Sequence, residues 1–392
     1  MGILSQQLDQ LEFEIPVINF ARLAIITAKG GGSVNTFYCK TKILSGPGAT
    51  VGLKALGSRR LLMVADPYFT KDGTARKIAE LSGAEIRIFD KIQPDPSVEL
   101  AAEGTAVMKE FAPDTVCALG GGSAMDCAKA MVYFSGQEVT LVAIPTTSGS
   151  GSEVTNFTVL THGSTKSPLV DDRLLPDVAI LDSGLLRQLP KSLIADCGFD
   201  VLAHALEGYV ATGGGTMTDV LAREAFAIVY AELPASYGGR QAVRQRLHEA
   251  SCMAGMAFSQ AGLGLCHALS HALGGLFHLP HGRLNAILLP EVVACNAHIC
   301  QEKYAKLARY AGLGGSADTL AVRNLRNGLI RLRRQLQLPE TLAQAGVDPR
   351  QLRQQATVIT EMTLADPCCK TNPLPVASHM VQGILEAVTG RG

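Results

Sequence analysis

Residues 115–130, TVCALGGGSAMDCAKA, decide the fold of this sequence. They begin with the pattern of a buried strand, pass through Gly120, Gly121 and Gly122 into Ser123, and end with the composition of a helix. Glycines let the backbone approach a ligand closely, and a helix start offers unpaired N–H groups to a phosphate. A tight strand-to-helix turn without a ligand explains the glycines equally well. The stretch is not a GxGxxG fingerprint, because no acidic residue ends a strand about 20 residues later.

The same alternation of strand and helix extends to both sides of this stretch. Apolar runs with the composition of strands lie at residues 60–66, 85–90, 115–120, 141–145 and 178–182. Helical stretches lie at residues 73–83 and 124–134. Such alternation is typical of a mostly parallel sheet with helices on both faces. We therefore expect an α/β domain that binds a nucleotide.

The pattern changes after about residue 186, where the β-branched runs end. Long helical segments follow, such as DVLAREAFAIVYAEL and VRNLRNGLIRLRRQLQL. A chain of 392 residues is also longer than one hydrophobic core usually serves. The sequence therefore predicts an N-terminal extension at 1–34, a dinucleotide-binding α/β domain at 35–185 and an all-α, metal-binding domain at 186–392. In the extension, PVINFARLAIITA (16–28) predicts an amphipathic helix, tethered by Gly30–Gly32.

Composition excludes several classes of protein. Hydrophobic residues make up 47% and charged residues 18% of the chain, as in an ordinary globular protein. The 35 basic and 35 acidic residues balance, so we expect no nucleic-acid partner. No apolar run is long enough for a membrane span, and no signal peptide is recognisable. The ten cysteines are scattered through apolar segments and the adjacent pair Cys368-Cys369 is not a CxxC, which favours a reduced, cytoplasmic protein.

Polar residues near strand ends are candidates for binding the nucleotide. Asp66 ends the run LLMVAD, where a carboxylate could bind ribose hydroxyls and repel a 2′-phosphate; a turn-forming role before Pro67 is the alternative. The loop IPTTSGSGSEVTN (144–156) follows another strand. A loop that is merely solvated would not need a Pro-Thr-Thr anchored on a strand and followed by two glycines, so dinucleotide binding is the favoured interpretation. The hydroxyl side chains of this loop are Thr146, Thr147, Ser150 and Ser152. Lys166 could contact a ribose or phosphate, or lie free on the surface.

Histidines and a carboxylate in the second half are candidates for binding a metal. Asp200 and His204 are four residues apart on a predicted helix, so both side chains leave the same face. His267 and His271 repeat this spacing on another helix, and His281 follows in the loop LPHG. A carboxylate and several imidazoles suit a divalent metal such as iron or zinc, although each histidine alone is more often structural.

The spacing leaves two rival ligands and excludes one enzyme class. Asp196 lies one turn before Asp200, and His278 lies close to His281, so either could replace an expected ligand. The HExxH motif of metalloproteases is absent, because Ala268 follows His267.

These segments together resemble the iron-containing (group III) alcohol dehydrogenases. The resemblance covers roughly residues 42–380 and rests on GGGSAMDCAKA, AIPTTSGSGSEVT, PDVAILD, GFDVLAHALEGY, GMAFSQAGLGLCHALSHALGG, LPHG and DPCCKTNP. In NTFYCKTKILSGPG, GGGSAMD and MAFSQAGLGL it is closest to the 1-propanol dehydrogenases of propanediol-utilisation microcompartments. It implies the dehydroquinate synthase-like fold of that family.

The resemblance also assigns roles to residues. It implies that the metal ligands are Asp200, His204, His267 and His281, and that His271 is the catalytic histidine beside the nicotinamide. It implies that the cofactor contacts come from Asp66, Gly121, Gly122, Ser123, Asp126, Thr146, Thr147, Ser150, Ser152 and Lys166. The sequence departs from the family pattern at Ser150, at Arg283-Leu284 and at Leu374. Arg283 follows the implied ligand His281 closely in the sequence, so the family pattern does not predict the charge beside this ligand.

The expected activity is reversible hydride transfer between a short primary alcohol and NAD(H), with Fe²⁺ as the metal and Zn²⁺ as the alternative. The expected partners are a small alcohol or aldehyde and a second copy of the chain in a dimer or larger homo-oligomer. Residues 1–34 resemble the encapsulation peptides that bind a microcompartment shell protein; a disordered start, or a helix packed on the enzyme's own dimer, is the alternative. We thus expect a cytoplasmic enzyme inside a bacterial microcompartment. A cyclase resembling dehydroquinate synthase would need more basic residues for its phosphate-bearing substrate. A non-catalytic compartment protein would not need an intact ligand set.

Overall fold

The computed structural model describes residues 26–27, 33–34, 36–162 and 165–390. The chain divides into two compact units, residues 1–36 and residues 37–392. In the first, β1 (Ile26–Thr27) pairs antiparallel with β2 (Ser33–Val34). The helix predicted at 16–28 is therefore wrong at its end, where the β-branched Ile26 and Thr27 favour a strand. The rest of that helix and the glycine tether lie outside the described residues.

The second unit begins with a six-stranded sheet in which every neighbouring pair is parallel. Across the sheet the order is β3-β10-β7-β6-β4-β5. The strands are β3 (Lys42–Ser45), β4 (Arg60–Ala65), β5 (Glu85–Phe89), β6 (Thr115–Gly120), β7 (Thr140–Pro145) and β10 (Val178–Leu181). The five predicted strands are all present, and β3 is an edge strand that the sequence pattern did not reveal.

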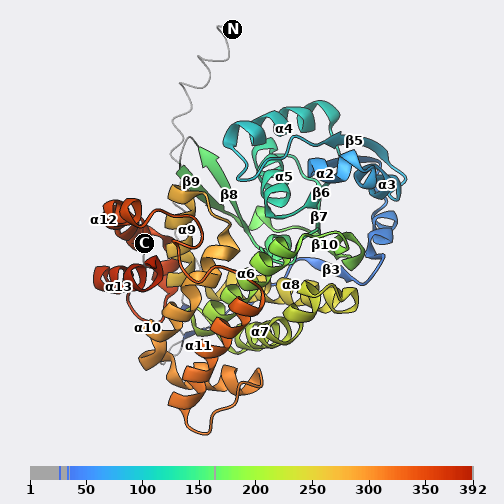
Figure 1. Cartoon of the computed structure of the whole chain (residues 1–392). Helices are drawn as coiled ribbons and strands as arrows, with labels where there is room; N and C mark the ends of the chain where they lie inside the picture. The colour runs from blue at the N-terminus through green and yellow to red at the C-terminus, as the bar shows by residue number, and fades with distance from the viewer. Residues whose placement is uncertain (1–25, 28–32, 35, 163–164, 391–392) are drawn as a thin grey trace. The chain divides into compact units, whose positions relative to one another are not determined.

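Both faces of this sheet are buried, as parallel sheets require. Alternate residues of β4 point to opposite faces: Leu62 and Val64 pack with one apolar cluster, while Leu61 and Met63 pack with another. The first cluster includes side chains of α4 (Val98–Phe111) and α5 (Gly122–Ser135). The second includes side chains of η2 (Ala49–Leu56) and α3 (Thr74–Glu80). Figure 1 shows α4 and α5 on one side of the strands.

The strand order reverses at the carboxyl ends of β4 and β6. The chain runs from β4 outward to β5 and then crosses back over β4 to β6. In open α/β sheets, nucleotides bind at such a reversal of strand order. Asp66 directly follows β4 and Gly121 directly follows β6, and the N–H of Asp66 donates to the carbonyl of Leu119 over 2.9 Å.

A β-hairpin interrupts the alternation between β7 and β10, and the sequence analysis did not predict it. Its strands, β8 (Phe157–His162) and β9 (Thr165–Val170), pair antiparallel in a separate two-stranded sheet. β8 packs against α5, where the buried Lys129 donates from Nζ to the carbonyl oxygens of Thr155 and Phe157. A lysine within α5 thus fixes the start of the hairpin.

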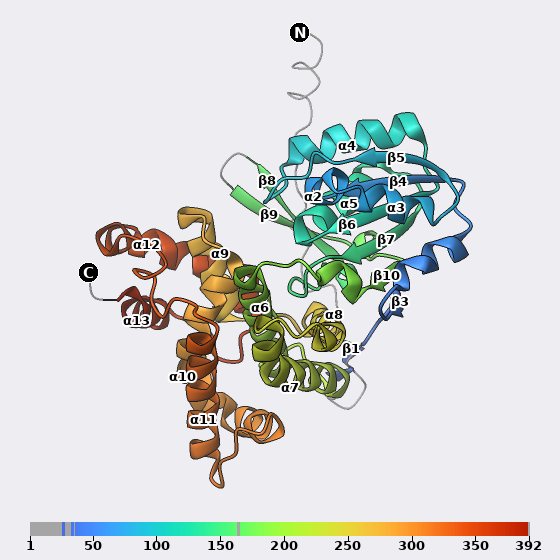
Figure 2. The same ribbon diagram turned by 45° about the vertical axis from the view of Figure 1, so that its right-hand side comes forward.

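The rest of the described chain after β10 is helical, which confirms the predicted α/β-plus-helical fold class. Its α-helices are α6 (Lys191–Val210), α7 (Thr216–Tyr237), α8 (Arg244–Ala261), α9 (Leu265–Phe277), α10 (His281–Tyr310), α11 (Asp318–Gln335), α12 (Pro349–Ala365) and α13 (Ser378–Thr389). α6 is the central helix: all its residues from Ile194 to Val210 except Cys197 are buried. It packs against α7, α8 and α10 (Figure 2). In the described part of the chain, no helix combines the length and the apolar character of a membrane span.

Candidate metal centre and cofactor loops

The central helix α6 supplies the first two candidate ligands. Asp200 and His204 lie one turn apart on it, and both are buried. A charged carboxylate is costly in an apolar interior unless it is paired or binds a metal. The carboxylate of Asp200 therefore requires a cation or hydrogen-bond donors close to it.

Two further helices begin beside Asp200 and supply its neighbours. His267 lies in the first turn of α9, and His281 is the first residue of α10 rather than a loop residue as we expected. Gly282 allows α10 to start here, because a Cβ at this position would lie 1.9 Å from the carbonyl oxygen of Asp196 in α6. Any other residue at 282 would push α10, and His281 with it, away from α6.

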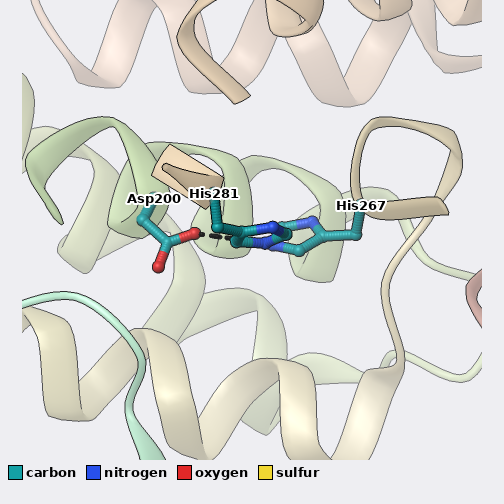
Figure 3. Close-up of side chains that lie close together, drawn as sticks. All are labelled: Asp200, His267 and His281. Carbon is teal, nitrogen blue, oxygen red and sulfur yellow. Dashed lines mark ion pairs between the residues drawn. The ribbon is translucent and has the colours of Figure 1, made fainter. Parts of the chain in front are cut away.

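The side chains from these three helices converge. Oδ1 of Asp200 lies 3.6 Å from Nε2 of His281, 3.9 Å from Nε2 of His267 and 4.0 Å from Nε2 of His204. Asp200, His267 and His281 each offer a donor atom within 4.8 Å of the other two (Figure 3). Ligand atoms around a tetrahedral metal lie about 3.4 Å apart, so small movements would complete the site.

One of these donor atoms also lacks an alternative partner. Nε2 of His267 is buried, and the described residues offer it no hydrogen bond. A buried polar atom without a partner needs an explanation, and an ion at the centre of the cluster provides one. One carboxylate and two clustered imidazoles, with Nε2 of His204 4.0 Å from the carboxylate, form a donor set that suits divalent iron or zinc. The residues present therefore fit the metal that the sequence predicted.

Charge in the cluster is arranged as metal ligation requires. Burial lowers the pKa of His204, and it lowers that of His267 well below the usual value, so both imidazoles are neutral. Burial acts to raise the pKa of Asp200, but the charge that His204, His281 and His267 carry when protonated, together with the hydrogen bond from Asn285, outweighs it and the pKa is lowered. Metal ligands must be deprotonated, and this centre holds its carboxylate and imidazoles in that state.

Glu207, which the sequence analysis missed, fixes the orientation of His267. It lies in α6 one turn after His204, and its Oε2 faces Nδ1 of His267 at 2.6 Å. It also accepts the backbone N–H groups of Gly264, Cys266 and His267, which begin α9. A carboxylate on the far ring nitrogen leaves Nε2 free for the metal. The signal in the sequence was an acidic residue on the same face of an apolar helix as His204.

Asn285, also missed, holds the carboxylate of Asp200. Its Nδ2 donates to Oδ1 of Asp200 over 2.8 Å, and its own Oδ1 accepts from Oγ of Ser270. Asn285 lies one turn after His281 on α10. The ligands thus rest on a layer of buried polar side chains that spacing alone does not identify.

The two rival ligands have other roles. Asp196 makes a two-pronged ion pair with Arg283: Nε donates to Oδ1 over 3.2 Å and Nη2 to Oδ2 over 2.9 Å. This pair also accounts for the unusual charge beside His281, because Arg283 points to α6. His278 is exposed and ends α9 in the left-handed conformation. The structure shows no contact that would make either residue a ligand.

His271 lies at the edge of the cluster and is more exposed than His267. Its ring stacks on that of His281, with centroids 5.2 Å apart, and 44% of its side chain is exposed. Nδ1 of His271 lies 2.8 Å from Oδ2 of Asp366, which sequence reasoning did not single out. Burial acts to raise the pKa of Asp366, but the hydrogen bond from His271 opposes it and the pKa is lowered.

The predicted phosphate turn lies where the strand order of the sheet reverses. Gly121 precedes α5, and Gly122 and Ser123 form its first turn, which has no side-chain cap. A Cβ on Gly120 would lie 3.3 Å from Cβ of Asp66, so the turn and this carboxylate are neighbours. Oδ1 of Asp66 accepts the N–H of Tyr68 and caps α2 (Pro67–Lys71). The turn-forming role of Asp66 is thus present, and it engages one of the two oxygens.

The hydroxyl loop after β7 connects this turn to the metal centre. A Cβ on Gly121 would lie 3.4 Å from Oγ1 of Thr147, and one on Gly122 would lie 3.4 Å from Oγ of Ser150. On its other side, the loop packs so closely on α6 that a Cβ on Gly149 would lie 3.2 Å from Cβ of Cys197. The hydroxyl loop therefore contacts both the glycine turn before α5 and the helix α6 that carries Asp200 and His204. Thr146 is buried at the start of the loop.

Two of the predicted cofactor residues, Ser152 and Asp126, contact each other. Oγ of Ser152 donates to Oδ1 of Asp126 over 2.9 Å, and the other carboxylate oxygen accepts the N–H of Val159 in β8. These contacts tie the hydroxyl loop and the hairpin to α5, so a structural role accounts for both side chains. Lys166 is in β9, opposite Thr161, and its side chain lies outside the described atoms.

A doubly wound parallel sheet beside a helical region with clustered carboxylate and imidazole donors points to an oxidoreductase that uses a nucleotide and a metal. Comparison with known proteins identifies which one. The chain belongs to the iron-containing alcohol dehydrogenase family: residues 40–183 match its N-terminal part and residues 194–389 its C-terminal part. The family resemblance is thus confirmed, and the cyclase and non-catalytic alternatives fall away.

Individual relatives match over nearly the whole chain. A 1-propanol dehydrogenase of Citrobacter freundii is 40% identical, with 90% of this chain and 99% of the relative covered. An NADPH-dependent butanol dehydrogenase of Clostridium saccharobutylicum is 36% identical, with 90% and 97% covered. The solved structure of an iron-containing alcohol dehydrogenase from Thermococcus thioreducens has a TM-score of 0.84 at 31% identity, with 90% and 99% covered.

Proposed function

We propose that this alcohol dehydrogenase interconverts short primary alcohols and their aldehydes with NAD(H), and that Asp200, His204, His267 and His281 hold its divalent metal. The observation that carries the proposal concerns Nε2 of His267. This atom is buried without a hydrogen-bond partner among the described residues, and it lies 3.9 Å from Oδ1 of Asp200. The names of the propanol and butanol dehydrogenases among its relatives support the substrate class.

The bound groups supply chemistry that the side chains lack. When bound, the metal polarises the oxygen of the substrate and the nicotinamide ring takes up or gives the hydride. The chain itself positions the ligands: Glu207 orients His267, and Asn285 orients Asp200. No protein nucleophile is required.

His271 is the residue we propose for moving the proton. Its hydrogen bond to Asp366 holds Nδ1, which leaves Nε2 as the ring nitrogen that can exchange a proton. Because 44% of the side chain is exposed, the proton can pass on to solvent. Substitution by alanine should therefore slow turnover while metal content stays unchanged.

The test of the metal site compares four proteins purified without air: wild type, His267→Ala, His281→Ala and the control His278→Ala. We expect the two ligand variants to lose both bound metal and propanal reduction, because each removes a predicted donor. His278→Ala should retain both, since this histidine caps a helix end. We propose Fe²⁺ as the native metal, so elemental analysis should find iron in the wild type. Stoichiometric metal in His267→Ala would refute the assignment.

We further propose that Asp66 makes the enzyme prefer NADH, because a carboxylate at this end of β4 repels a 2′-phosphate. In Asp66→Ser, serine keeps the cap on α2, so a change in preference is separable from loss of the helix. The ratio of kcat/KM for NADPH to that for NADH should rise. Asp72→Ser is the matched control, since Asp72 accepts the N–H of Thr74 in the same way. An equal ratio in both variants would leave Asp66 with its capping role alone.

We propose, finally, that residues 1–34 direct the enzyme into a bacterial microcompartment. The support is that these residues precede the family match at residue 40 and that residues 16–25 carry apolar side chains at helical spacing in the sequence. A fluorescent protein fused to residues 1–34 should enter compartments in a cell that makes them. Diffuse fluorescence, with the shell intact, would refute the proposal.

A further inference from the structure

A second group of potential ligands lies beside the metal centre. It consists of His271 in α9 and of Asp366 and Cys368, which follow the end of α12. One ligand atom of each lies within 4.8 Å of the others. The next residue, Cys369, has a different role, since its thiol donates to the carbonyl of Thr363 over 3.0 Å.

We propose that His271, Asp366 and Cys368 form a second divalent-cation site that prefers zinc, and that zinc bound there inhibits the enzyme. Imidazole, carboxylate and thiolate together are a ligand set of zinc, and sulfur is the softest of them. The centre built on Asp200 contains nitrogen and oxygen donors but no sulfur. Cys368 thus gives the second site a chemical basis for selecting zinc over iron.

The local backbone fixes two of the three ligands. Asp366 ends α12 and begins the short helix η7 (Pro367–Thr371), and its Oδ1 accepts the N–H of Cys368 over 2.8 Å. This hydrogen bond holds the carboxylate of Asp366 against the backbone of Cys368, so both residues are positioned by the start of η7. Preorganised ligands bind metal without the entropy cost of ordering a loop.

The third ligand has room to adjust. Donor atoms around tetrahedral zinc lie about 3.3 to 3.8 Å apart, whereas Nδ1 of His271 and Oδ2 of Asp366 are 2.8 Å apart. The pair must widen by a few tenths of an ångström, and the exposed His271 ring can move that far. The same exposure leaves the fourth coordination position open to water and lets the cation enter from solvent.

Inhibition follows from the position of His271. Its ring stacks on His281 at an interplanar angle of 15°. A cation that holds this ring also takes the nitrogen that pairs with Asp366 and fixes the group that we propose moves the proton. The inhibitory part of the inference therefore rests on the proposed function, but the binding of zinc does not.

The experiment titrates Zn²⁺ into the iron-loaded enzyme without air and measures bound zinc, retained iron and propanal reduction. Wild type should bind one extra zinc per chain, keep its iron and lose activity about tenfold or more. Cys368→Ser should bind this zinc at least about tenfold more weakly and stay active, because even the loss of a residue behind a ligand costs about 10- to 100-fold in metal affinity and a lost ligand should cost no less. Cys369→Ser, the matched control, should behave as wild type.

Four results separate the possibilities. Equal zinc binding by Cys368→Ser and wild type would overturn the inference, as would release of iron in proportion to zinc bound. If Cys368→Ser does not fold, a second measurement uses the iron-loaded double variant Cys369→Ser/Cys39→Ser. Cobalt added to this protein should give a thiolate-to-cobalt absorption band. Absence of the band would equally overturn the inference. Selective zinc binding without any alcohol turnover would refute the proposed function and leave the cation site standing.

Discussion

At the scale of single residues, Glu207 links the metal centre to the folding of a helix. Three backbone N–H groups at the start of α9 point to its carboxylate, and so does Nδ1 of His267. The first N–H groups of a helix need partners from outside the helix. Burial raises the pKa of Glu207 to about 7, although the N–H groups of Cys266, His267 and Gly264 act in the opposite direction. Its charge thus depends on the contacts that also position the ligand.

We predict that Glu207→Gln weakens metal binding about 10- to 100-fold, the usual cost of losing a carboxylate behind a ligating histidine. The midpoint of thermal unfolding should fall even in the metal-free protein, because the amide accepts fewer of the N–H groups at the start of α9. Titration with a metal chelator and calorimetry measure the two effects. Glu302→Gln is the control, since Glu302 forms an exposed ion pair with Lys306. Unchanged metal affinity in Glu207→Gln would show that His267 needs no orienting partner.

At the scale of elements, the contact between α6 and the start of α10 places His281. Gly282 sits against the backbone of Asp196, and the ion pair between Asp196 and Arg283 closes over the same junction. The ion pair between Asp196 and Arg283 and the absence of a side chain at Gly282 thus set where α10 begins. The position of His281 is a property of this helix junction more than of its own contacts.

We predict that Gly282→Ala displaces α10 and costs several kcal/mol of stability, because its Cβ has no space at 1.9 Å from a carbonyl oxygen. Bound metal should fall with it. Gly383→Ala in α13 is the matched control: no atom lies within 4 Å of its Cβ, so the helix should gain about 0.5–1 kcal/mol. Chemical denaturation of both variants measures the difference. Equal stability for the two would mean that α10 adapts without moving His281.

The sequence predicted elements whose signal is local. Strands β4 to β7 and β10 are apolar runs, and the spacing of Asp200 and His204 brought both to one face of α6. It failed where a partner comes from far along the chain. The start of α9 has no capping residue of its own, because Glu207 caps it from 57 residues earlier. The hairpin β8–β9 rests on Lys129, whose role no pattern in a single sequence displays.

At the scale of the whole molecule, the compact unit from residue 37 onward contains every candidate ligand and cofactor residue. We predict that deletion of residues 1–36 leaves metal content and propanal turnover of the purified enzyme within about twofold of the full chain. The reason is that this unit has its own core on both faces of the sheet and around α6. Steady-state kinetics and size-exclusion chromatography of the two proteins measure the outcome. Loss of turnover after the deletion would make the extension part of the working enzyme.

The hydroxyl loop has a consequence for how this molecule can be altered. All four proposed metal ligands come from the helical region and all predicted cofactor contacts from the α/β region, so recombining these regions between relatives should exchange nucleotide preference without disturbing the metal. The loop is where such a hybrid would fail. Gly151 faces Gly255 of α8 so closely that a Cβ would lie 2.7 Å from its Cα, and Gly149 faces Cys197. Parents of a hybrid must therefore match in these small residues, whatever their overall similarity.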